Sequence, residues 1–425
     1  MNKKVCVSTL GCPKNIVDSE KLLAILSHEY QITDDPNQTD YLIINTCGFL
    51  QSSVNENEDY ISQAIKLKKI GKIEKLFVVG CLVSRYSKEL AEKFPEIDAF
   101  YGTDFLDKLP QKIQQNHNEL YGERKLLTPS HYAYLKISDG CEHNCAFCAI
   151  PAIKGKFKSI PIERVIEEAN FLAKLGVKEL ILIAQDTTSY GVDLYKKQML
   201  NELLQEFTKI EQFKWIRLMY TYPRKFPQNI LETINASNNI AKYIDIPIQH
   251  INTEILKKMG RGMNKEETIN LLKTIRQSVP NIAVRTTFIV GFPDETEKEF
   301  AELRDFVEEF EFERVGVFEY SAEVGTPANK FGDNISQDTK ARRLEDLMLL
   351  QQKISRKKNR KLIGSEIEIL IDEVKDNFAI GRTQHDAPEI DQQVRVKSNK
   401  LKQGEFYNVK IVDAYEYDLI GKLVK

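Results

Sequence analysis

Three cysteines in the middle of the chain could carry distinctive chemistry. Cys141, Cys145 and Cys148 stand in the pattern C-x3-C-x2-C, within the stretch Ser-Asp-Gly-Cys-Glu-His-Asn-Cys-Ala-Phe-Cys. Three thiolates on one short loop can hold three irons of a 4Fe–4S cluster, whereas a cluster that only transfers electrons normally has four cysteine ligands. This loop is therefore expected to leave one iron open for a substrate or a cofactor.

A structural zinc site is the alternative for the same loop. Such a site needs a fourth Cys or His, and His143 lies nearby, between the first two cysteines. The tight loop makes that position awkward for a fourth ligand. Spacing and ligand softness therefore favour an iron–sulfur cluster. The colour of the protein would separate the two, since iron–sulfur protein is brown and zinc protein is colourless.

Three further cysteines each follow an apolar stretch near the start of the chain. Cys12, Cys47 and Cys81 come after stretches 4–10, 41–46 and 75–80, which we expect to be strands. Amphipathic segments at about 19–28 and 56–69 alternate with them, and this alternation predicts a parallel sheet. Parallel strands place all three cysteines at the carboxyl edge of the sheet, where open α/β sheets bind ligands.

This placement predicts that Cys12, Cys47 and Cys81 hold a second cluster. The alternative is that they are small buried side chains at strand ends, because free cysteine is often buried. Gly11, Gly48 and Gly80 each flank one of the three cysteines, and we expect them to let the backbone approach a bulky ligand. The seventh cysteine, Cys6, falls within the first strand and is expected to be part of the core.

Length and composition limit the class of protein. The 425 residues predict two or three domains, and 42% hydrophobic with 29% charged residues is usual for a soluble protein with a sizeable core. A net charge of −2 argues against a polycation that coats nucleic acid. We find no apolar stretch of about 18 residues and no apolar region long enough for a signal peptide. Seven cysteines without a secretion signal then predict a cytoplasmic protein that binds metal.

The middle of the chain repeats a strand–helix pattern six times. The expected strands are 132–137, 179–184, 215–220, 243–247, 283–291 and 314–320, and the expected helices are 161–175, 199–210, 227–236, 265–278 and 296–310. Thr296 and Glu299 predict a capping box for the last helix. Six such units suggest a partial barrel, whose active site would lie at the carboxyl ends of the strands.

Polar side chains follow several of these strands. They occur in Gln185-Asp186-Thr187-Thr188, in Asp245 to His250, in Arg285 to Pro293 and in Glu319-Tyr320-Ser321. Their individual roles do not follow from the sequence. For His250, a structural role is as well supported as a catalytic one.

The last part of the chain predicts a helix and a small β-domain. A helix is expected at 341–354, followed by the basic run 356–361, for which a solvated helix end and an RNA contact are equally supported. Short β-patterned runs at 366–371, 378–382, 394–398, 407–414 and 419–424 predict a small OB-like barrel. Residues 364–425 hold twelve acidic and nine basic side chains, which suits a basic protein partner better than RNA.

The cysteine loop, with Phe147 before its last cysteine, resembles the signature of the radical S-adenosylmethionine (SAM) enzymes. In that superfamily the open iron binds SAM, which is then cleaved to methionine and a 5′-deoxyadenosyl radical. A three-cysteine α/β domain before such a loop resembles the methylthiotransferases. This resemblance implies two 4Fe–4S clusters and SAM, and three domains: an N-terminal α/β domain at 1–118, a radical-SAM core at 127–357 and a TRAM domain at 360–425.

The segment Thr-Leu-Gly-Cys-Pro-Lys-Asn at 9–15 and the segment Gln-Asp-Thr-Thr-Ser-Tyr-Gly at 185–191 resemble the branch that modifies a ribosomal protein. The resemblance implies a methylthio group placed on the β-carbon of an aspartate of small-subunit ribosomal protein S twelve. That protein would bind at the TRAM domain and the barrel mouth, and an electron donor would be needed. The alternatives are the same reaction on an adenosine of tRNA, and a non-catalytic Fe–S scaffold or electron carrier.

Two short segments depart from the family pattern. Lys154-Gly155 and Ser159-Ile160 stand where Arg-Gly and Ser-Arg are usual, and Asp294 replaces a glycine. Lysine keeps the positive charge of arginine but not its bidentate fork. These departures concern local contacts and leave the cysteine pattern intact.

Overall fold

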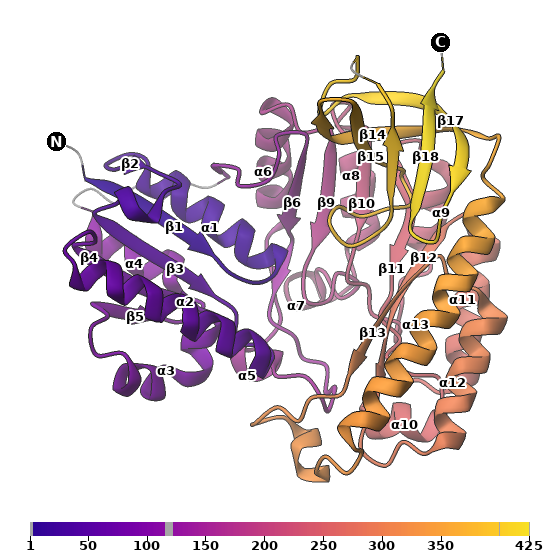
Figure 1. The fold of residues 1–425 in the computed structure, drawn as a ribbon, viewed down its shortest axis with the longest axis horizontal. Coiled ribbons are helices and arrows are strands. Elements are labelled where there is room, and N and C mark those ends of the chain that lie inside the picture. The colour runs from indigo at the N-terminus through magenta and orange to yellow at the C-terminus, as the bar shows by residue number, and fades with distance from the viewer. Residues whose placement is uncertain (1–2, 115–121, 399, 425) are drawn as a thin grey trace.

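The computed structural model describes residues 3–114, 122–398 and 400–424. These residues form an N-terminal five-stranded sheet, a central six-stranded sheet and a C-terminal closed barrel (Figure 1). A two-stranded ribbon of β7 (Ser138–Asp139) and β8 (Lys158–Ser159) flanks the cysteine loop of the central part. The predicted fold class, α/β with a small β-barrel appended, is confirmed.

The N-terminal sheet is parallel throughout, with strand order β2-β1-β3-β4-β5. Its strands are β1 (Lys4–Thr9), β2 (Gln31–Ile32), β3 (Tyr41–Thr46), β4 (Lys75–Gly80) and β5 (Ala99–Tyr101), with the 3-10 helix η1 (Pro36–Gln38) before β3. The three predicted strands are present. The two additional strands are two and three residues long, too short to produce a recognisable apolar pattern.

Four helices connect these strands, and they begin earlier than the sequence suggested. They are α1 (Pro13–Leu26), α2 (Gln51–Lys69), α3 (Cys81–Lys93) and α4 (Phe105–Ile113). The expected starts at 19 and 56 were wrong. Helix α1 begins directly after Cys12, because Pro13 has the backbone geometry of a first helical residue. Cys12 therefore caps α1, and Cys81 opens α3.

The central sheet is open and parallel, with strand order β13-β12-β11-β10-β9-β6. Its strands are β6 (Tyr132–Lys136), β9 (Glu179–Ile183), β10 (Trp215–Leu218), β11 (Ile240–Asp245), β12 (Ala283–Val290) and β13 (Arg314–Glu319). All six predicted strands are confirmed, and the sheet is a partial barrel as expected. The capping box of Thr296 and Glu299 is also present.

Helices cover the outer face of this sheet. They are α6 (Ile162–Lys174), α8 (Leu200–Thr208), α9 (Asn229–Ala236), α11 (Lys265–Ser278) and α12 (Glu297–Phe310). The short helices α5 (Ile150–Lys154), α7 (Val192–Tyr195) and α10 (Thr253–Lys258) and the 3-10 helix η2 (Pro327–Phe331) lie in the connections. The largest apolar cluster joins alternate strand residues, such as Leu135, Leu182 and Val284, to helical residues such as Leu172 and Leu303. This packing is the main core of the molecule.

The inner face of the central sheet is filled by the two flanking parts of the chain. Strand residues of the opposite alternation, including Tyr134, Ile183 and Tyr243, form a separate buried cluster. Val17 of α1 and Ala387 of the C-terminal barrel complete that cluster. Both neighbouring domains therefore reach inside the partial barrel and close it.

The C-terminal barrel is closed in the order β14-β15-β16-β18-β17. Its strands are β14 (Glu366–Lys375), β15 (Phe378–Arg382), β16 (Gln393–Val396), β17 (Phe406–Ala414) and β18 (Asp418–Leu423). All five predicted strands are present. The loop 383–391 between β15 and β16 enters the central sheet, where Arg285 pairs with Asp391 at 3.3 Å and Arg314 pairs with Asp386.

Helix α13 (Gln337–Arg360) runs beside β13 and α12 and leads to the C-terminal barrel (Figure 1). It is longer than the predicted 341–354 and contains most of the basic run. Lys357 pairs with Glu311, Lys358 pairs with Glu313, and Arg356 lies 3.2 Å from Glu416. These ion pairs favour the interpretation of the run as a helix end over an RNA contact. Within the described ranges, no helix has the length and apolarity needed to cross a membrane.

Candidate functional site

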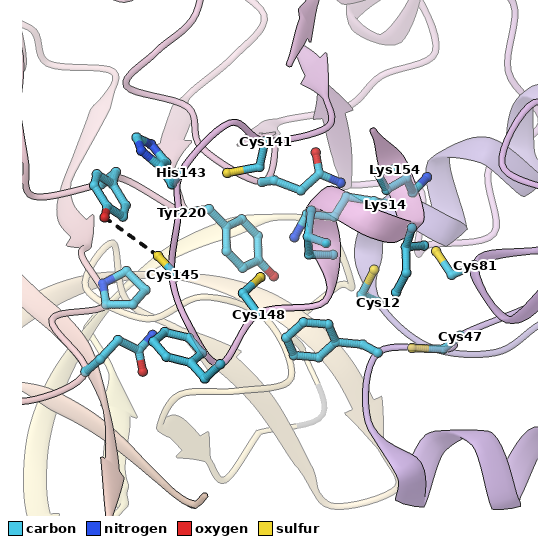
Figure 2. A pocket seen from close by; sticks show the side chains of 18 of the residues that line it. Cys12, Lys14, Cys47, Cys81, Cys141, His143, Cys145, Cys148, Lys154 and Tyr220 are labelled. Carbon is cyan, nitrogen blue, oxygen red and sulfur yellow. Dashed lines mark hydrogen bonds between the residues drawn. The ribbon is translucent and has the colours of Figure 1, made fainter. Parts of the chain in front are cut away.

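Both cysteine triads open into a single cavity of about 380 Å³ (Figure 2). The cavity lies at the carboxyl ends of the N-terminal and the central strands, where the two sheets face each other. Its lining includes all six predicted cysteines: Cys12, Cys47, Cys81, Cys141, Cys145 and Cys148. The two triads therefore share one space.

The loop that carries Cys141, Cys145 and Cys148 is fastened by the central domain on both sides. The backbone nitrogen of Ala146 donates to the carbonyl of Met259 at 2.8 Å, and its carbonyl accepts from Ala328 at 2.8 Å. Gly260 fits closely against this loop, since a Cβ there would stand 2.2 Å from the carbonyl oxygen of Asn144. Its φ of +70° also favours glycine. The loop is thus held in place by the backbone.

The six thiols are buried or partly buried, and desolvation raises the pKa of several of them. Desolvation raises the pKa of Cys148 and of Cys81 to about 12, and that of Cys141 to about 11. Burial also raises the pKa of Cys47. Such thiols stay protonated at neutral pH until a metal displaces the proton. Soft, desolvated thiols that share a cavity suit an iron–sulfur cluster.

The Cys145 sulfur has two polar neighbours. Arg261 Nη1 lies 3.3 Å from Cys145 Sγ, and the Tyr222 hydroxyl lies 3.7 Å from it. The Arg261 guanidinium also stacks on the Tyr222 ring, with 4.3 Å to the ring centroid. Hydrogen bonds and a positive charge at a ligating sulfur tune a bound cluster.

The glycines beside the N-terminal cysteines have a different role from the one expected. A Cβ on Gly11 would stand 2.6 Å from Cys47 Cβ, and one on Gly48 would stand 2.7 Å from the Cα of Leu82. Gly80 faces the side chain of Asn45 at 2.5 Å in the same way. These glycines therefore let the three strand-end loops approach one another. They bring the cysteines together and do not serve as the contact surface for a ligand.

His143 lines the cavity but is held by other partners. Its Nε2 lies 2.7 Å from Asp186 Oδ2, and its ring stacks on Tyr222 with 3.6 Å between centroids. Among the described residues, no three His, Cys, Asp or Glu side chains stand close enough to share one metal ion. His143 is therefore engaged by Asp186 and Tyr222 and is not presented as the fourth ligand of a zinc site.

The cavity also offers polar atoms that have no partner. The side-chain oxygens of Gln185 and Gln249 and the Nε of Arg261 are buried without a hydrogen bond within the described part of the chain. Buried polar atoms normally have partners, so exceptions call for an explanation. These atoms fit a polar ligand such as SAM, which carries hydroxyl, amino and carboxylate groups.

Other predicted strand-end residues lie outside the cavity. His250 is fully buried, lies 3.2 Å from Glu295 and accepts a hydrogen bond from the backbone of Asn252, so its role is structural. Arg285 and Asp245 form an ion pair at 3.0 Å. Glu319 contacts Gln337 on α13, and Ser321 contacts Glu323. These residues position the strands and do not line the site.

The sequence did not single out Tyr220, Tyr222 and Arg261, all of which line the cavity. The two tyrosines follow β10, where an aromatic residue is easily taken for core. Arg261 follows helix α10 and is brought in by the fold alone. The backbone gives one further sign, because Tyr220 and Gln249 have positive φ values of 57° and 78°. Such strain in residues other than glycine is concentrated at functional sites.

Buried ion pairs fix the N-terminal domain to the central one beside the cavity. Asp18 of α1 pairs with Lys136, and with Lys154 at 3.6 Å. Lys154 also lies 3.3 Å from Asp139. On the other side, Arg85 lies 3.0 Å from Glu323. These contacts set the position of one triad relative to the other.

Comparison with known protein families divides the chain into three matched regions. The uncharacterized protein family UPF0004 matches residues 4–102, the Radical SAM superfamily matches residues 135–307, and the TRAM domain matches residues 363–424. The Radical SAM match implies SAM and a 4Fe–4S cluster as cofactors. The first region contains one cysteine triad and the second contains the other.

Relatives match the chain over its whole length. It is 46% identical to the ribosomal protein uS12 methylthiotransferase RimO of Chloroherpeton thalassium, over 99% of this chain and 98% of that protein. It is 47% identical to the protein of the same description in Thermoanaerobacter sp., over 99% of this chain and 100% of that protein.

Among solved structures, the radical SAM methyltransferase TsrM of Kitasatospora setae has a similar fold. The TM-score is 0.57 with 14% sequence identity, over 74% of this chain and 72% of that one. The cobalamin-dependent radical SAM enzyme OxsB gives a TM-score of 0.52 with 13% identity, over 82% of this chain and 56% of that one. At these identities the likeness shows a shared fold. The full-length relatives show more, and the chain belongs to the RimO family of radical-SAM methylthiotransferases.

Proposed function

We propose that this enzyme places a methylthio group on the β-carbon of an aspartate of ribosomal protein uS12. Relatives about 46% identical over their full length are uS12 methylthiotransferases, which supports this substrate. In the proposal, Cys141, Cys145 and Cys148 hold the cluster that binds SAM. Cys12, Cys47 and Cys81 hold an auxiliary 4Fe–4S cluster.

The observation that carries the proposal is that both triads open into one cavity. Methylthiolation replaces a C–H bond of the substrate by a C–S bond, and the sulfur receives a methyl group. When bound, SAM and its cluster supply the radical that takes the hydrogen atom and a second SAM supplies the methyl group, while the auxiliary cluster carries the sulfur. The same β-carbon of the substrate must be reached from the SAM-binding triad and from the auxiliary triad. A cavity shared by the two triads allows this.

The protein's own residues hold and shield this chemistry. The cysteine loop is fixed through Met259 and Ala328, and Arg261 places a positive charge beside Cys145. Gln185 and Gln249 present free acceptors to a bound ligand. Apolar side chains such as Phe147 line the rest of the cavity and limit access of water to a reactive radical.

We further propose domain boundaries at 1–118, 127–357 and 360–425. The three matched families begin and end inside these limits, which supports the division. The first boundary falls at 118, which lies outside the described residues. In the proposal, uS12 contacts the TRAM domain and the rim of the cavity, and an external donor supplies electrons.

The substrate is tested by offering two candidates in parallel. The anaerobically reconstituted enzyme is incubated with SAM, a reductant and a sulfur source, together with uS12 or with unmodified tRNA. Mass spectrometry is expected to detect a methylthio gain on an aspartate of uS12 and none on tRNA. A gain on tRNA alone would contradict the substrate but keep the reaction.

The same incubation tests the non-catalytic alternative. A scaffold or electron carrier would be brown but would not convert SAM to 5′-deoxyadenosine. Formation of 5′-deoxyadenosine without a product on either candidate would support the radical chemistry and reject both substrates.

A further inference from the structure

We infer that Lys14 binds the carboxylate of the target aspartate and so selects and positions the substrate. This inference rests on the proposed function and adds a residue to it. Lys14 lies in the first turn of α1, next to the auxiliary triad, and its side chain lines the shared cavity.

The ammonium group of Lys14 stands between the two triads. Its Nζ lies 3.4 Å from the centroid of the Tyr220 ring (Figure 2). Lys14 belongs to the N-terminal domain, whereas Tyr220 follows β10 of the central sheet. The cation therefore reaches across the cavity, from the Cys12 side toward the Cys148 side.

The cavity is lined by cations and, within the described ranges, by no carboxylate. Lys154 is neutralised by Asp18 and Asp139. Arg261 faces Cys145 and the Tyr222 ring, so it is engaged at the SAM-binding triad. Two of the three cations of the lining are thus already engaged, which leaves one that can bind an anionic ligand.

Lys14 is the cation in this lining that remains available. In the described part of the chain, no carboxylate lies within ion-pair distance of its Nζ, and its neighbour is an uncharged ring. A cation–π contact stabilises an ammonium without neutralising it. The three N–H donors of lysine still require acceptors. A carboxylate that enters the cavity loses bound water and needs a charged donor of this kind.

The backbone of Tyr220 holds its ring in a fixed position beside this ammonium. Tyr220 has a φ of 57°, which is unfavourable for a residue other than glycine. Its backbone nitrogen donates to Asp245 Oδ2 at 3.0 Å, and its carbonyl accepts from Thr187 at 3.0 Å. These bonds keep the strained conformation and aim the ring into the cavity.

Carboxylate binding at this point would set the geometry of the reaction. In aspartate the carboxylate carbon is bonded directly to the β-carbon, where the proposed methylthio group is added. A cation that fixes the carboxylate therefore fixes the reacting carbon between the two triads. An asparagine at the same position would lack the charge that Lys14 recognises.

The experiment combines variants of the enzyme with variants of the substrate. The reconstituted wild type, Lys14→Met, Lys14→Arg and the surface control Lys66→Met are each assayed with uS12 and with uS12 whose target aspartate is asparagine. For each pair, kcat/KM for methylthiolation is measured. Iron and sulfide content, the electron paramagnetic resonance spectra of the reduced clusters and 5′-deoxyadenosine formation are recorded as independent readouts.

For wild type, aspartate is expected to be preferred over asparagine. Lys14→Met should lower kcat/KM for the aspartate substrate about 10- to 100-fold, the range of a hydrogen bond to a charged group, and should leave the asparagine substrate nearly unchanged. Lys14→Arg should restore part of the preference, and Lys66→Met should match wild type. Iron content, spectra and SAM cleavage should stay the same in all four proteins.

Two results would overturn the inference. One is an equal loss on both substrates together with changed iron content or spectra, which would mean that Lys14 serves the auxiliary cluster. The other is an unchanged aspartate preference in Lys14→Met. If wild type itself does not modify uS12, the proposed function fails, and the inference that rests on it fails for that separate reason.

Discussion

At the scale of single residues, the seven cysteines divide into two groups of three and one that stands apart. The six line one cavity, whereas Cys6 is buried in the core of the N-terminal sheet. This division gives a direct test, because Cys6 is a cysteine of the same chain that should hold no metal.

Loss of one triad should separate radical formation from sulfur transfer. Cys148→Ala is expected to lower iron content by about half and to abolish SAM cleavage. Cys81→Ala should lower iron content equally but keep 5′-deoxyadenosine formation and abolish the methylthio product. Iron analysis and chromatography of the SAM products would measure both effects.

Cys6→Ala serves as the control for these two variants. It should keep full iron content and lose only the packing of a small side chain, about 1 kcal/mol of stability. Loss of iron in Cys6→Ala, or full iron in Cys81→Ala, would contradict the assignment of the triads.

The close contact at Gly260 provides a second prediction for a single residue. Gly260→Ala should displace the cysteine loop, because the new Cβ would collide with the Asn144 carbonyl. We expect weakened binding of the first cluster, measured as lower iron content and slower SAM cleavage. Gly176→Ala is the matched control, since Gly176 has a φ of +90° and no other atom lies within 4 Å of the place a Cβ would take.

Both glycine variants carry backbone strain of about 1–2 kcal/mol. Only the variant at Gly260 adds the collision with the loop. Equal iron content in the two variants would show that the close contact does not position the cysteines.

The cysteines could be found from the sequence because their spacing is local or follows clear apolar strands. Cys141, Cys145 and Cys148 form a pattern within one loop, and Cys81 directly follows a strand-like stretch. Arg261 could not be found in this way. It lies far along the chain from Cys145 and reaches it through the packing of α10 against the loop, which no local pattern encodes.

At the scale of elements, the junction between the central sheet and the C-terminal barrel is electrostatic. Arg382 of β15 is buried and contacts Glu179 of β9 at 2.6 Å and Asp372 of β14 at 2.7 Å. Burial alone would raise the pKa of both carboxyl groups, but the charge of Arg382 outweighs it and lowers both. The two carboxylates therefore stay ionised beside the arginine.

This network predicts acid lability at the junction. A carboxyl group whose pKa is lower in the folded state stabilises the fold above its unfolded pKa, about 4 for Asp and Glu. That stability is lost as the pH falls below 4 toward the folded pKa. We expect the contribution of this network, measured as the difference in urea unfolding between wild type and Arg382→Met, to be constant from pH 7 to 5 and to decline below pH 4.

Removal of the arginine tests the same network at neutral pH. Arg382→Met should cost about 3–5 kcal/mol, since Glu179 is left buried with one partner fewer, and should weaken the acid dependence. Arg395→Met is the control in the same barrel, because its pair with Asp418 is exposed and is worth less than about 1 kcal/mol. Similar stabilities of the two variants would contradict the claim that the buried network stabilises the fold more than the exposed pair.

The strands of this junction were predictable, whereas their contacts were not. Runs such as those of β16 and β17 show apolar residues at alternate positions, which predicts half-buried strands. The start of α1 was missed because Pro13 resembles a break after the strand, although proline also suits a first helical turn. The insertion of loop 383–391 into the central sheet depends on the shape and charge of residues far away in the sequence, so no local pattern predicts it.

At the scale of the whole molecule, the distance between the triads depends on contacts between domains. Asp18 joins α1 to Lys136 and Lys154, and Glu323 accepts from Arg85 and from the backbone of Gln51. These contacts lie on either side of the cavity and keep the two sheets facing each other.

Weakening these contacts between the domains should separate SAM cleavage from formation of the methylthio product. Asp18→Asn is expected to leave SAM cleavage and iron content nearly intact, because the cysteine loop remains fixed by its own domain. The methylthio product should fall several-fold, so the ratio of 5′-deoxyadenosine to product should rise. Glu202→Gln removes an exposed pair on α8 and is expected to leave this ratio unchanged. A normal ratio in Asp18→Asn would mean that other contacts set the distance.

During translation, the inner face of the central sheet is made before the loop 383–391 that covers it. Arg217, Arg285 and Arg314 leave the ribosome before their partners Gln384, Asp391 and Asp386. A nascent chain that ends before this loop holds an inner sheet face without its cover, with apolar surface exposed to aggregation. The central sheet is thus completed by a loop that is translated after all six of its strands, so products truncated before this loop should be recognised by chaperones and proteases as unfinished.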